Sequence, residues 1–320
     1  MSLTVQQQSL AVTLASGDVL RLQRFTGAAP GPPVLMLHGA IENGRIFYSG
    51  SGKGLAPYLA RNGFDVYVAD LRGRGKSTPP IGPTSRFGQT EAIIEDIPAC
   101  VEAIRGLRGP VPQRWVAHSW GGVLFSSVLA RFPEYTELVD SLAYFGSKRT
   151  VRVWNLQRIL KVELVWNGLC PLACRLAGYL PARQLRIGSD SETTRSYRQS
   201  AAWVRDDAWV DADDGFDYGA AIKKLALPPI WYLAAENDRA LGHPRDIRDF
   251  MESAGRQQCR YTVLSRKNGN RHDYDHISML THPEAVQDHF PEVLKWLRQN
   301  QRTPASLQGA ENGTDVFNQH

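Results

Sequence analysis

The sequence is poor in cysteine and has no long run of apolar residues. Four cysteines in 320 residues are too few and too widely spaced for a disulfide framework, and they form neither a CxxC pair nor a Cys/His cluster typical of zinc sites. No run of about 18 apolar residues occurs, so we expect no transmembrane helix. Residues 1–25 lack the basic start and apolar core of a secretory signal peptide. We therefore predict a cytoplasmic protein whose cysteines are buried thiols, namely Cys100, Cys170, Cys174 and Cys259.

The charged residues are unevenly distributed along the chain. The composition is 42% hydrophobic and 22% charged, which excludes wholesale disorder, collagen and a coiled coil. The net charge of +5 comes from one segment, because residues 148–205 hold 11 Lys and Arg against 3 Asp and Glu. Since the rest of the chain is slightly acidic, we predict no nucleic-acid partner.

Apolar runs and helical patterns alternate along the chain. An N-terminal hairpin turns at residues 16–18, and the first later run, 33–37, is continuous, as in a strand buried on both faces. We predict strands at 33–37, 66–69, 114–117, 138–145, 229–233 and 261–264, and helices at 55–62, 90–107, 121–132, 220–225, 246–253 and 283–298. This alternation predicts an α/β fold with a mostly parallel central sheet and helices on both faces. Residues 301–320 are polar and without periodicity, which predicts a disordered tail.

The strongest local motif is Ala117-His118-Ser119-Trp120-Gly121, between the predicted strand 114–117 and the predicted helix 121–132. Small residues on both sides of a serine let the strand and the helix approach closely, and the sharp turn lifts the hydroxyl above the sheet. This arrangement is typical of a nucleophile elbow, although its first small residue is alanine rather than glycine. The motif therefore indicates Ser119 as a nucleophile.

With this elbow after a central strand, the sequence resembles the α/β-hydrolase superfamily, in particular its serine esterase and lipase-like branch with a cap domain. In that family the catalytic acid follows a late strand and the base precedes the last helix. The resemblance assigns the acid to Asp238, with Glu236 as the alternative. It assigns the base to His276 in preference to His272.

The resemblance extends to the loop after the third strand, Leu37-His38-Gly39-Ala40-Ile41. By that resemblance the backbone N–H groups of Ala40 and Trp120 form the oxyanion hole, and His38 braces the loop. Residues 70–77 also resemble the family's turn after its fourth strand. The resemblance covers residues 34–297.

Two other patterns point to different chemistry, and we reject both. Gly75-Lys76-Ser77 ends like a phosphate-binding P-loop, but Asp70 stands where that motif requires glycine, and its charge would repel phosphate. The loop that holds His272, Asp273, Asp275 and His276 has the residue types of a metal site, but one short loop rarely turns four ligands inward. We therefore expect neither a cofactor nor a metal.

Residues 146–215 depart from the strand–helix pattern and are too many for a plain loop. They combine a helical pattern of apolar residues with the basic excess and four of the 8 tryptophans. The resemblance identifies them as a helical cap over Ser119, which leaves residues 1–145 and 216–300 as the hydrolase core. A basic, tryptophan-bearing helix can also contact a membrane surface weakly. We expect instead that its apolar face packs on the core.

The resemblance implies a serine hydrolase that cleaves a small-molecule carboxylic ester or thioester with an apolar acyl group. Ser119 would attack the carbonyl, His276 would take its proton, and Asp238 would orient the imidazole. A serine nucleophile argues against the dehalogenase and epoxide-hydrolase branches, which use an aspartate. Two alternatives stay open: an acyltransferase with the same triad, and a non-catalytic binding protein on the same fold. The basic segment further predicts a preference for anionic substrates.

Overall fold

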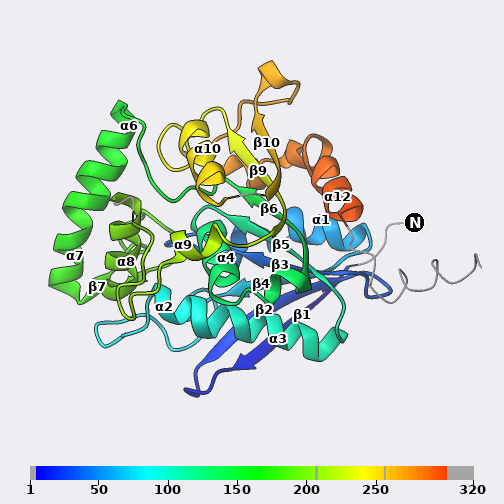
Figure 1. Ribbon diagram of the computed structural model, residues 1–320, viewed down its shortest axis with the longest axis horizontal. Helices are drawn as coiled ribbons and strands as arrows, with labels where there is room; N and C mark the ends of the chain where they lie inside the picture. Colours follow the sequence, from blue (N-terminus) through cyan, green and yellow to red (C-terminus); the bar gives the residue numbers. More distant parts are fainter. Residues whose placement is uncertain (1–4, 206–207, 256, 301–320) are drawn as a thin grey trace, which may run out of the picture.

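Eight strands form one mostly parallel sheet in the computed structural model, which describes residues 5–205, 208–255 and 257–300. The strand order is β1-β2-β4-β3-β5-β6-β9-β10. Strand β2 is antiparallel to β1 and β4, and every pairing from β4 to β10 is parallel. The strands are β1 (Gln6–Thr13), β2 (Val19–Thr26), β3 (Pro33–Leu37), β4 (Asp65–Asp70), β5 (Gln113–His118), β6 (Val139–Phe145), β9 (Leu227–Ala235) and β10 (Gln257–Leu264). The predicted α/β fold class is confirmed (Figure 1).

Helices cover both faces of the sheet and explain why the central strands are apolar throughout. On one face α1 (Leu55–Arg61) and α12 (Phe290–Gln299) pack against the sheet. On the other face lie α3 (Ile97–Arg108), α4 (Trp120–Arg131) and α10 (Pro244–Ser253). Every residue of β3, β5 and β6 is buried between these layers, as expected for parallel strands. The carboxyl ends of these strands therefore offer a rigid edge for a site.

The predicted helix 283–298 is wrong as a single element. The structure has a 3₁₀ helix, η5 (Pro283–Gln287), followed by α12 (Phe290–Gln299), with Asp288 in a non-helical conformation between them. Pro291 lies in the first turn of α12, a position where a residue without an N–H is favoured. Because proline cannot donate the hydrogen bond that would continue a helix, η5 does not extend into α12. The predicted helix 90–107 likewise divides into α2 (Gln89–Glu91), a π-helical turn η2 (Ala92–Asp96) and α3.

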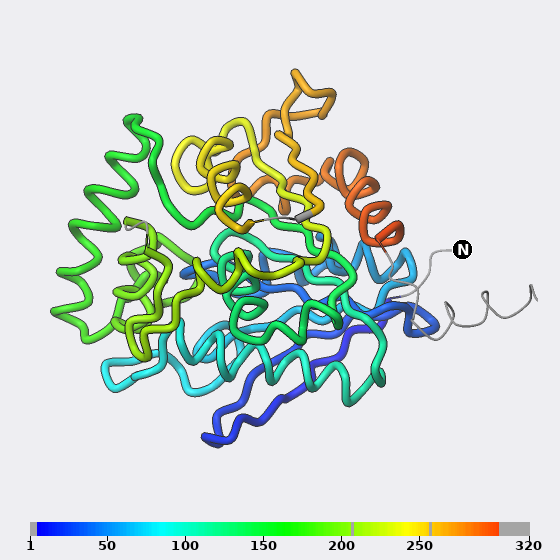
Figure 2. Tube along the Cα trace, viewed as in Figure 1, coloured from blue at the N-terminus to red at the C-terminus, as the bar shows by residue number. Residues whose placement is uncertain are grey.

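The segment between β6 and β9 lies to one side of the sheet, where Figure 2 draws much of it in green. Its first part is one continuous helix built from α6 (Leu156–Arg158), the π-helical η3 (Ile159–Leu169) and α7 (Cys170–Ala177). A second part contains the two-stranded sheet β7 (Tyr179–Leu180) and β8 (Glu192–Thr193), then α8 (Thr194–Arg205) and α9 (Tyr218–Ile222). The sequence did not predict β7, β8 or α8, and α9 begins two residues before the predicted helix 220–225. Figure 1 shows several of these elements beside the long helix.

The apolar face of the long helix does not pack on the core, contrary to our expectation. Leu156, Leu160 and Leu164 are 70%, 48% and 54% exposed, whereas Val162 between them is buried. The helix is apolar on both sides, and its middle turns are π-helical, with hydrogen bonds from residue i to i+5. A spacing of three and four residues therefore does not mark a single inward face here.

Three cysteines are buried as predicted, and one is not. Cys100, Cys170 and Cys174 are buried, whereas Cys259 on the edge strand β10 is exposed. Within the described ranges, no helix has both the length and the apolar character needed to cross a membrane. The predicted tail, residues 301–320, lies outside the described residues.

Candidate active site

Ser119 lies at the sharp turn between β5 and α4. Its φ of 52° and ψ of −121° place it in a region that costs about 1–3 kcal/mol for a residue with a Cβ. The turn is held because the Ser119 N–H donates to the Phe145 carbonyl at 2.7 Å. At Gly121 an added Cβ would lie 2.6 Å from the Leu37 carbonyl oxygen, so only glycine allows α4 to approach β3. The local sequence thus forms the strained turn that the motif predicts.

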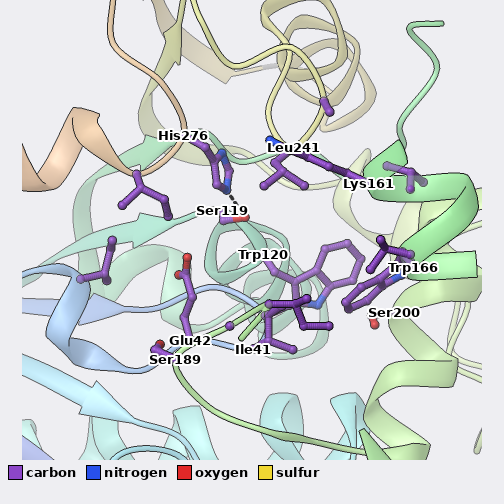
Figure 3. Close-up of a pocket in the computed structure, with 18 of the residues that line it drawn as sticks. Ile41, Glu42, Ser119, Trp120, Lys161, Trp166, Ser189, Ser200, Leu241 and His276 are labelled. Atoms are coloured by element: carbon purple, nitrogen blue, oxygen red, sulfur yellow. Dashed lines mark hydrogen bonds between the residues drawn. The ribbon is translucent and has the colours of Figure 1, made fainter. Parts of the chain in front are cut away.

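The structure brings His276 and Asp238 to this serine. His276 Nε2 lies 2.9 Å from Ser119 Oγ, the contact drawn in Figure 3, and His276 Nδ1 lies 2.5 Å from Asp238 Oδ2. Because a carboxylate only accepts hydrogen bonds, the proton of the neutral imidazole is on Nδ1. Nε2 is then free to accept the Ser119 hydroxyl. The three side chains form one hydrogen-bonded chain from the carboxylate to the hydroxyl.

Asp238 stays ionised although it is buried. Burial alone would raise its pKa, but His276 and the backbone N–H groups of Gly242 and Leu241 outweigh burial and lower it to about 2. The Leu241 N–H donates to Asp238 Oδ1 at 2.9 Å. One carboxylate oxygen is thus held by the backbone, which leaves the other for the imidazole.

The two alternative residues are not part of this chain of hydrogen bonds. Glu236 is exposed, two residues before the buried Asp238. His272 Nε2 instead lies 2.8 Å from the carboxylate of Glu284. The geometry therefore groups Asp238 and His276 with Ser119.

The loop after β3 runs directly past Ser119. An added Cβ at Gly39 would lie 2.8 Å from the Ser119 Cβ. His38 is buried, donates from Nδ1 to the Gly39 carbonyl at 2.8 Å and accepts the Leu71 N–H at Nε2, so it joins two loops as expected. Ala40 lines the cavity beside Ser119, and Trp120 is the first residue of α4. The first N–H groups of a helix have no partner inside it, which suits the predicted oxyanion role of Trp120.

A second pair of a carboxylate and an imidazole, Glu42 and His118, lies beside the first, and the sequence analysis missed it. His118 Nδ1 is 2.8 Å from Glu42 Oε2, and its Nε2 is 2.9 Å from the backbone carbonyl oxygen of His276. Both partners are acceptors, so His118 donates from both ring nitrogens and is an imidazolium. Glu42 Oε2 also accepts the Gly39 N–H at 3.0 Å.

Electrostatics support an ion pair at this position. Burial alone would lower the pKa of His118, but Glu42 and the His276 carbonyl raise it above its ordinary value. Burial would raise the pKa of Glu42, and His118, His276 and the Gly39 N–H lower it to about 2. The carboxyl ends of β3 and β5 are neighbours in the sheet. An acid shortly after β3 (Glu42) and a histidine at the end of β5 (His118) are therefore expected to lie close together, and this sequence signal could have predicted the pair.

Glu42, His118 and His276 also have the residue types of a metal site. One ligand atom from each lies within 4.8 Å of the other two. A metal ion there would require His118 to release its hydrogen bond to Glu42 and His276 to release Ser119. The set therefore fits a metal only if the Ser119–His276 hydrogen bond is lost.

A cavity of about 740 Å³ opens at Ser119. Its walls come from the loops at the carboxyl ends of the strands and from the inserted segment, and Figure 3 shows Trp166 and Lys161 of the long helix among the residues that line it. The volume suits a small-molecule ligand, and most of the wall is apolar. Val162, Val165, Leu241 and Ile277 contribute to this apolar wall.

Comparisons with known proteins agree with this fold. Residues 32–167 match a family model described as the alpha/beta hydrolase fold. Bifunctional epoxide hydrolase 2 from Sus scrofa is 30% identical over 118 residues, which are 37% of this chain and 19% of the relative. Triacylglycerol lipase 1 from Arabidopsis thaliana is 38% identical over 68 residues, which are 20% of this chain and 17% of the relative. Each match therefore spans under a fifth of the relative's length.

A solved structure resembles almost the whole chain. An esterase from Exiguobacterium antarcticum superposes with a TM-score of 0.58 at 16% identity, over 91% of this chain and 100% of that one. At this identity the likeness shows the fold alone.

Proposed function

The chain belongs to the α/β-hydrolase-fold superfamily, and from that premise we propose that it is a serine hydrolase. Its substrate is a carboxylic ester or thioester with an apolar acyl group. The observation that carries this proposal is the hydrogen-bonded chain Asp238–His276–Ser119, which ends at a mostly apolar cavity.

The reaction follows from the positions of the three side chains. Ser119 Oγ attacks the carbonyl carbon while His276 Nε2 takes the hydroxyl proton, and the backbone N–H groups of Ala40 and Trp120 stabilise the oxyanion. His276 then gives this proton to the departing alcohol or thiol. A water molecule, deprotonated by His276, attacks the acyl-enzyme and releases the acid and the free serine. Asp238 holds the tautomer that this sequence requires.

The inserted segment acts in this proposal as a cap over Ser119. Support comes from Val162, Val165 and Trp166 of the long helix, which form part of the cavity wall. Residues 146–215 are then the cap, and residues 1–145 and 216–300 are the core.

The outer side of the cap is a candidate for contact with an anionic lipid surface. The long helix exposes a row of large apolar side chains together with basic ones. Such a helix gains from apolar insertion and from attraction to anionic headgroups. The apolar row is Leu156, Ile159, Leu160, Leu164, Leu169, Leu172 and Leu176. Location in the cytoplasm stays a prediction, which cell fractionation would test.

The direct test is covalent labelling of the nucleophile. A fluorophosphonate probe should label the wild-type protein at one site, and Ser119→Ala should abolish both labelling and ester turnover while the protein stays folded. Ser51→Ala, at an exposed serine, is the matched control and should keep both. Labelling that persists in Ser119→Ala would show that another residue is the nucleophile.

Two further measurements distinguish the proposed hydrolase from an acyltransferase and from an epoxide hydrolase. An acyltransferase would pass the acyl group to an added alcohol or thiol in preference to water, so the products of acyl-enzyme breakdown distinguish it from a hydrolase. Epoxide hydrolysis is named for one relative, and turnover of an epoxide that survives Ser119→Ala would favour it.

A further inference from the structure

The charged side chains that line the cavity are mostly cations. Arg45, Lys148, Lys161 and Arg186 line it, and Glu42 is the one acidic side chain among its described lining residues. Glu42 already faces His118 at hydrogen-bond distance. The cavity beside Ser119 therefore has an excess of positive charge within a mostly apolar wall.

Lys148 differs from the other three cations because it is buried beside the reacting groups. It is only 8% exposed. Two residues before it in the chain, Gly146 packs so close to the His276 ring that an added Cβ on Gly146 would lie 3.0 Å from the ring. The Lys148 Nζ lies 6.0 Å from the centroid of the Trp120 ring. That ring is fixed because its Nε1 donates to Gln89 at 2.9 Å. The ammonium is thus positioned close to the residue that follows the nucleophile.

No oxygen of the described residues accepts a hydrogen bond from Lys148 Nζ. The carboxylates that face it are Asp238, Asp246 and Glu42, which attract the ammonium and oppose the lowering of its pKa by burial. Asp238 is engaged by His276 and Leu241. Asp246 directs Oδ1 to backbone N–H groups at 3.0 and 3.3 Å, and its buried Oδ2 has no hydrogen-bond partner among the described residues. The ammonium therefore keeps hydrogen-bond donors available toward the cavity that Lys148 lines, where an anionic ligand can accept them.

We propose that Lys148 binds an anionic group of the substrate, so that the preferred ester or thioester also carries a carboxylate or a phosphate. The proposal rests on the proposed hydrolase function and specifies its substrate class. The anionic group can belong to the acyl part or to the leaving group, and matched substrates distinguish these two sources.

The test compares pairs of substrates that differ by one anionic group. For the acyl part, the 4-nitrophenyl monoester of glutaric acid is compared with 4-nitrophenyl valerate, which has the same number of acyl carbons. For the leaving group, 4-(valeryloxy)phenyl phosphate is compared with phenyl valerate. We expect kcat/KM to be about 10- to 100-fold higher for the anionic member of at least one pair, the range of a charge-assisted hydrogen bond. Lys148→Met should reduce this ratio at least tenfold.

The matched control is Lys224→Met, which removes the same charge from an exposed position outside the cavity lining and should leave the ratio unchanged. Fluorophosphonate titration gives the concentration of folded, reactive enzyme for each variant. The double variant Lys148→Met/Asp246→Asn removes the buried charge of both residues. If Lys148 serves only to neutralise Asp246, the double variant will regain the anionic preference, which would overturn the proposal.

Two other results would also overturn it. Equal kcat/KM within both substrate pairs would mean that the cavity does not select an anion, and an unchanged ratio in Lys148→Met would assign the selection to another residue. Turnover of neutral valerate esters together with labelling of Ser119 would then leave the hydrolase proposal intact. Absence of both turnover and labelling would overturn the two proposals together.

Discussion

A protein side chain can be charged and buried when its neighbours supply the opposite charge or hydrogen bonds. The buried Asp238 and the largely enclosed Glu42 both satisfy this condition, and each holds a histidine through a carboxylate oxygen. The two imidazole rings lie with their centroids 4.7 Å apart. Two carboxylate–imidazole pairs thus meet at the proposed nucleophile. Substituting the carboxylate of one pair at a time distinguishes the contribution of each pair to catalysis.

Asp238→Asn should lower kcat by about 10⁴-fold, because the amide favours the wrong tautomer of His276. Glu236→Gln is the matched control, two residues away and exposed, and should change kcat by less than about twofold. Steady-state kinetics with a neutral ester measure both. A larger loss in Glu236→Gln than in Asp238→Asn would show that the acid is misassigned.

Glu42→Gln should move the basic limb of the pH profile to lower pH. In the wild type Glu42 raises the pKa of His118, so the His118 charge is present at low pH and is lost only as the pH rises through that raised value. Without the Glu42 carboxylate, the His118 ring loses its second proton at a lower pH. Loss of that proton removes one of the two hydrogen bonds that His118 donates. The measurement is kcat/KM against pH.

The control for this profile is Glu284→Gln, which removes the carboxylate beside the partly exposed His272 and should leave the profile unchanged. Identical profiles for wild type and Glu42→Gln would show that the Glu42–His118 pair does not influence the proposed reaction.

The site residues that the sequence analysis proposed are marked by their order along the chain, whereas those it missed are marked by their tertiary packing. Ser119, Asp238 and His276 each follow a recognisable strand in a fixed chain order, so the elbow motif together with the family resemblance was enough to propose them. Glu42 and His118 meet because the ends of β3 and β5 are adjacent, and Lys148 matters because its side chain is enclosed. Adjacency and enclosure depend on tertiary packing, which one sequence does not reveal.

At the scale of elements, α4 and the long helix of the proposed cap differ in how far they are buried. Every residue of α4 except the last is buried, which fixes the turn at Ser119. The long helix exposes much of its apolar surface. The helix at α4 was predicted correctly from the motif that starts it and the proline that follows it. For the long helix the apolar face was predicted to pack on the core, and this was wrong because π-helical turns alter the spacing.

This difference predicts unequal losses of stability. Leu129→Ala, at a fully buried position of α4, should lower the free energy of unfolding by about 2–5 kcal/mol. Leu164→Ala removes the same atoms from an exposed position of the cap helix and should lower it by less than about 0.5 kcal/mol. Urea unfolding measures both. A comparable loss in Leu164→Ala would mean that the outer face of the cap is covered in solution.

At the scale of the whole molecule, the positive charge and the exposed apolar row occur in the same segment. The protein should therefore sediment with phosphatidylglycerol vesicles more strongly than with phosphatidylcholine vesicles. Because exposed charges are screened beyond about 10 Å at 0.1 M salt, this binding should weaken at 0.5 M NaCl.

Lys161→Gln/Arg175→Gln should reduce the vesicle binding, since both residues are exposed on the cap helix. Lys223→Gln/Lys224→Gln is the control of equal charge change outside the cap. Equal binding to both kinds of vesicle would contradict an electrostatic contribution. Dimerisation without vesicle binding would show that the apolar row contacts a second copy.

The exposed Cys259 gives this protein a natural attachment point for chemical probes. It lies near the start of β10, whereas the proposed active site is at the carboxyl edge of the sheet. The other thiols are buried, and burial raises their pKa, that of Cys170 to about 11, so few thiolates form at neutral pH. A maleimide should therefore attach once to the native chain and four times after denaturation, which intact-mass spectrometry would count. A surface-immobilised enzyme tethered through Cys259 would present its cavity to the solution in one orientation.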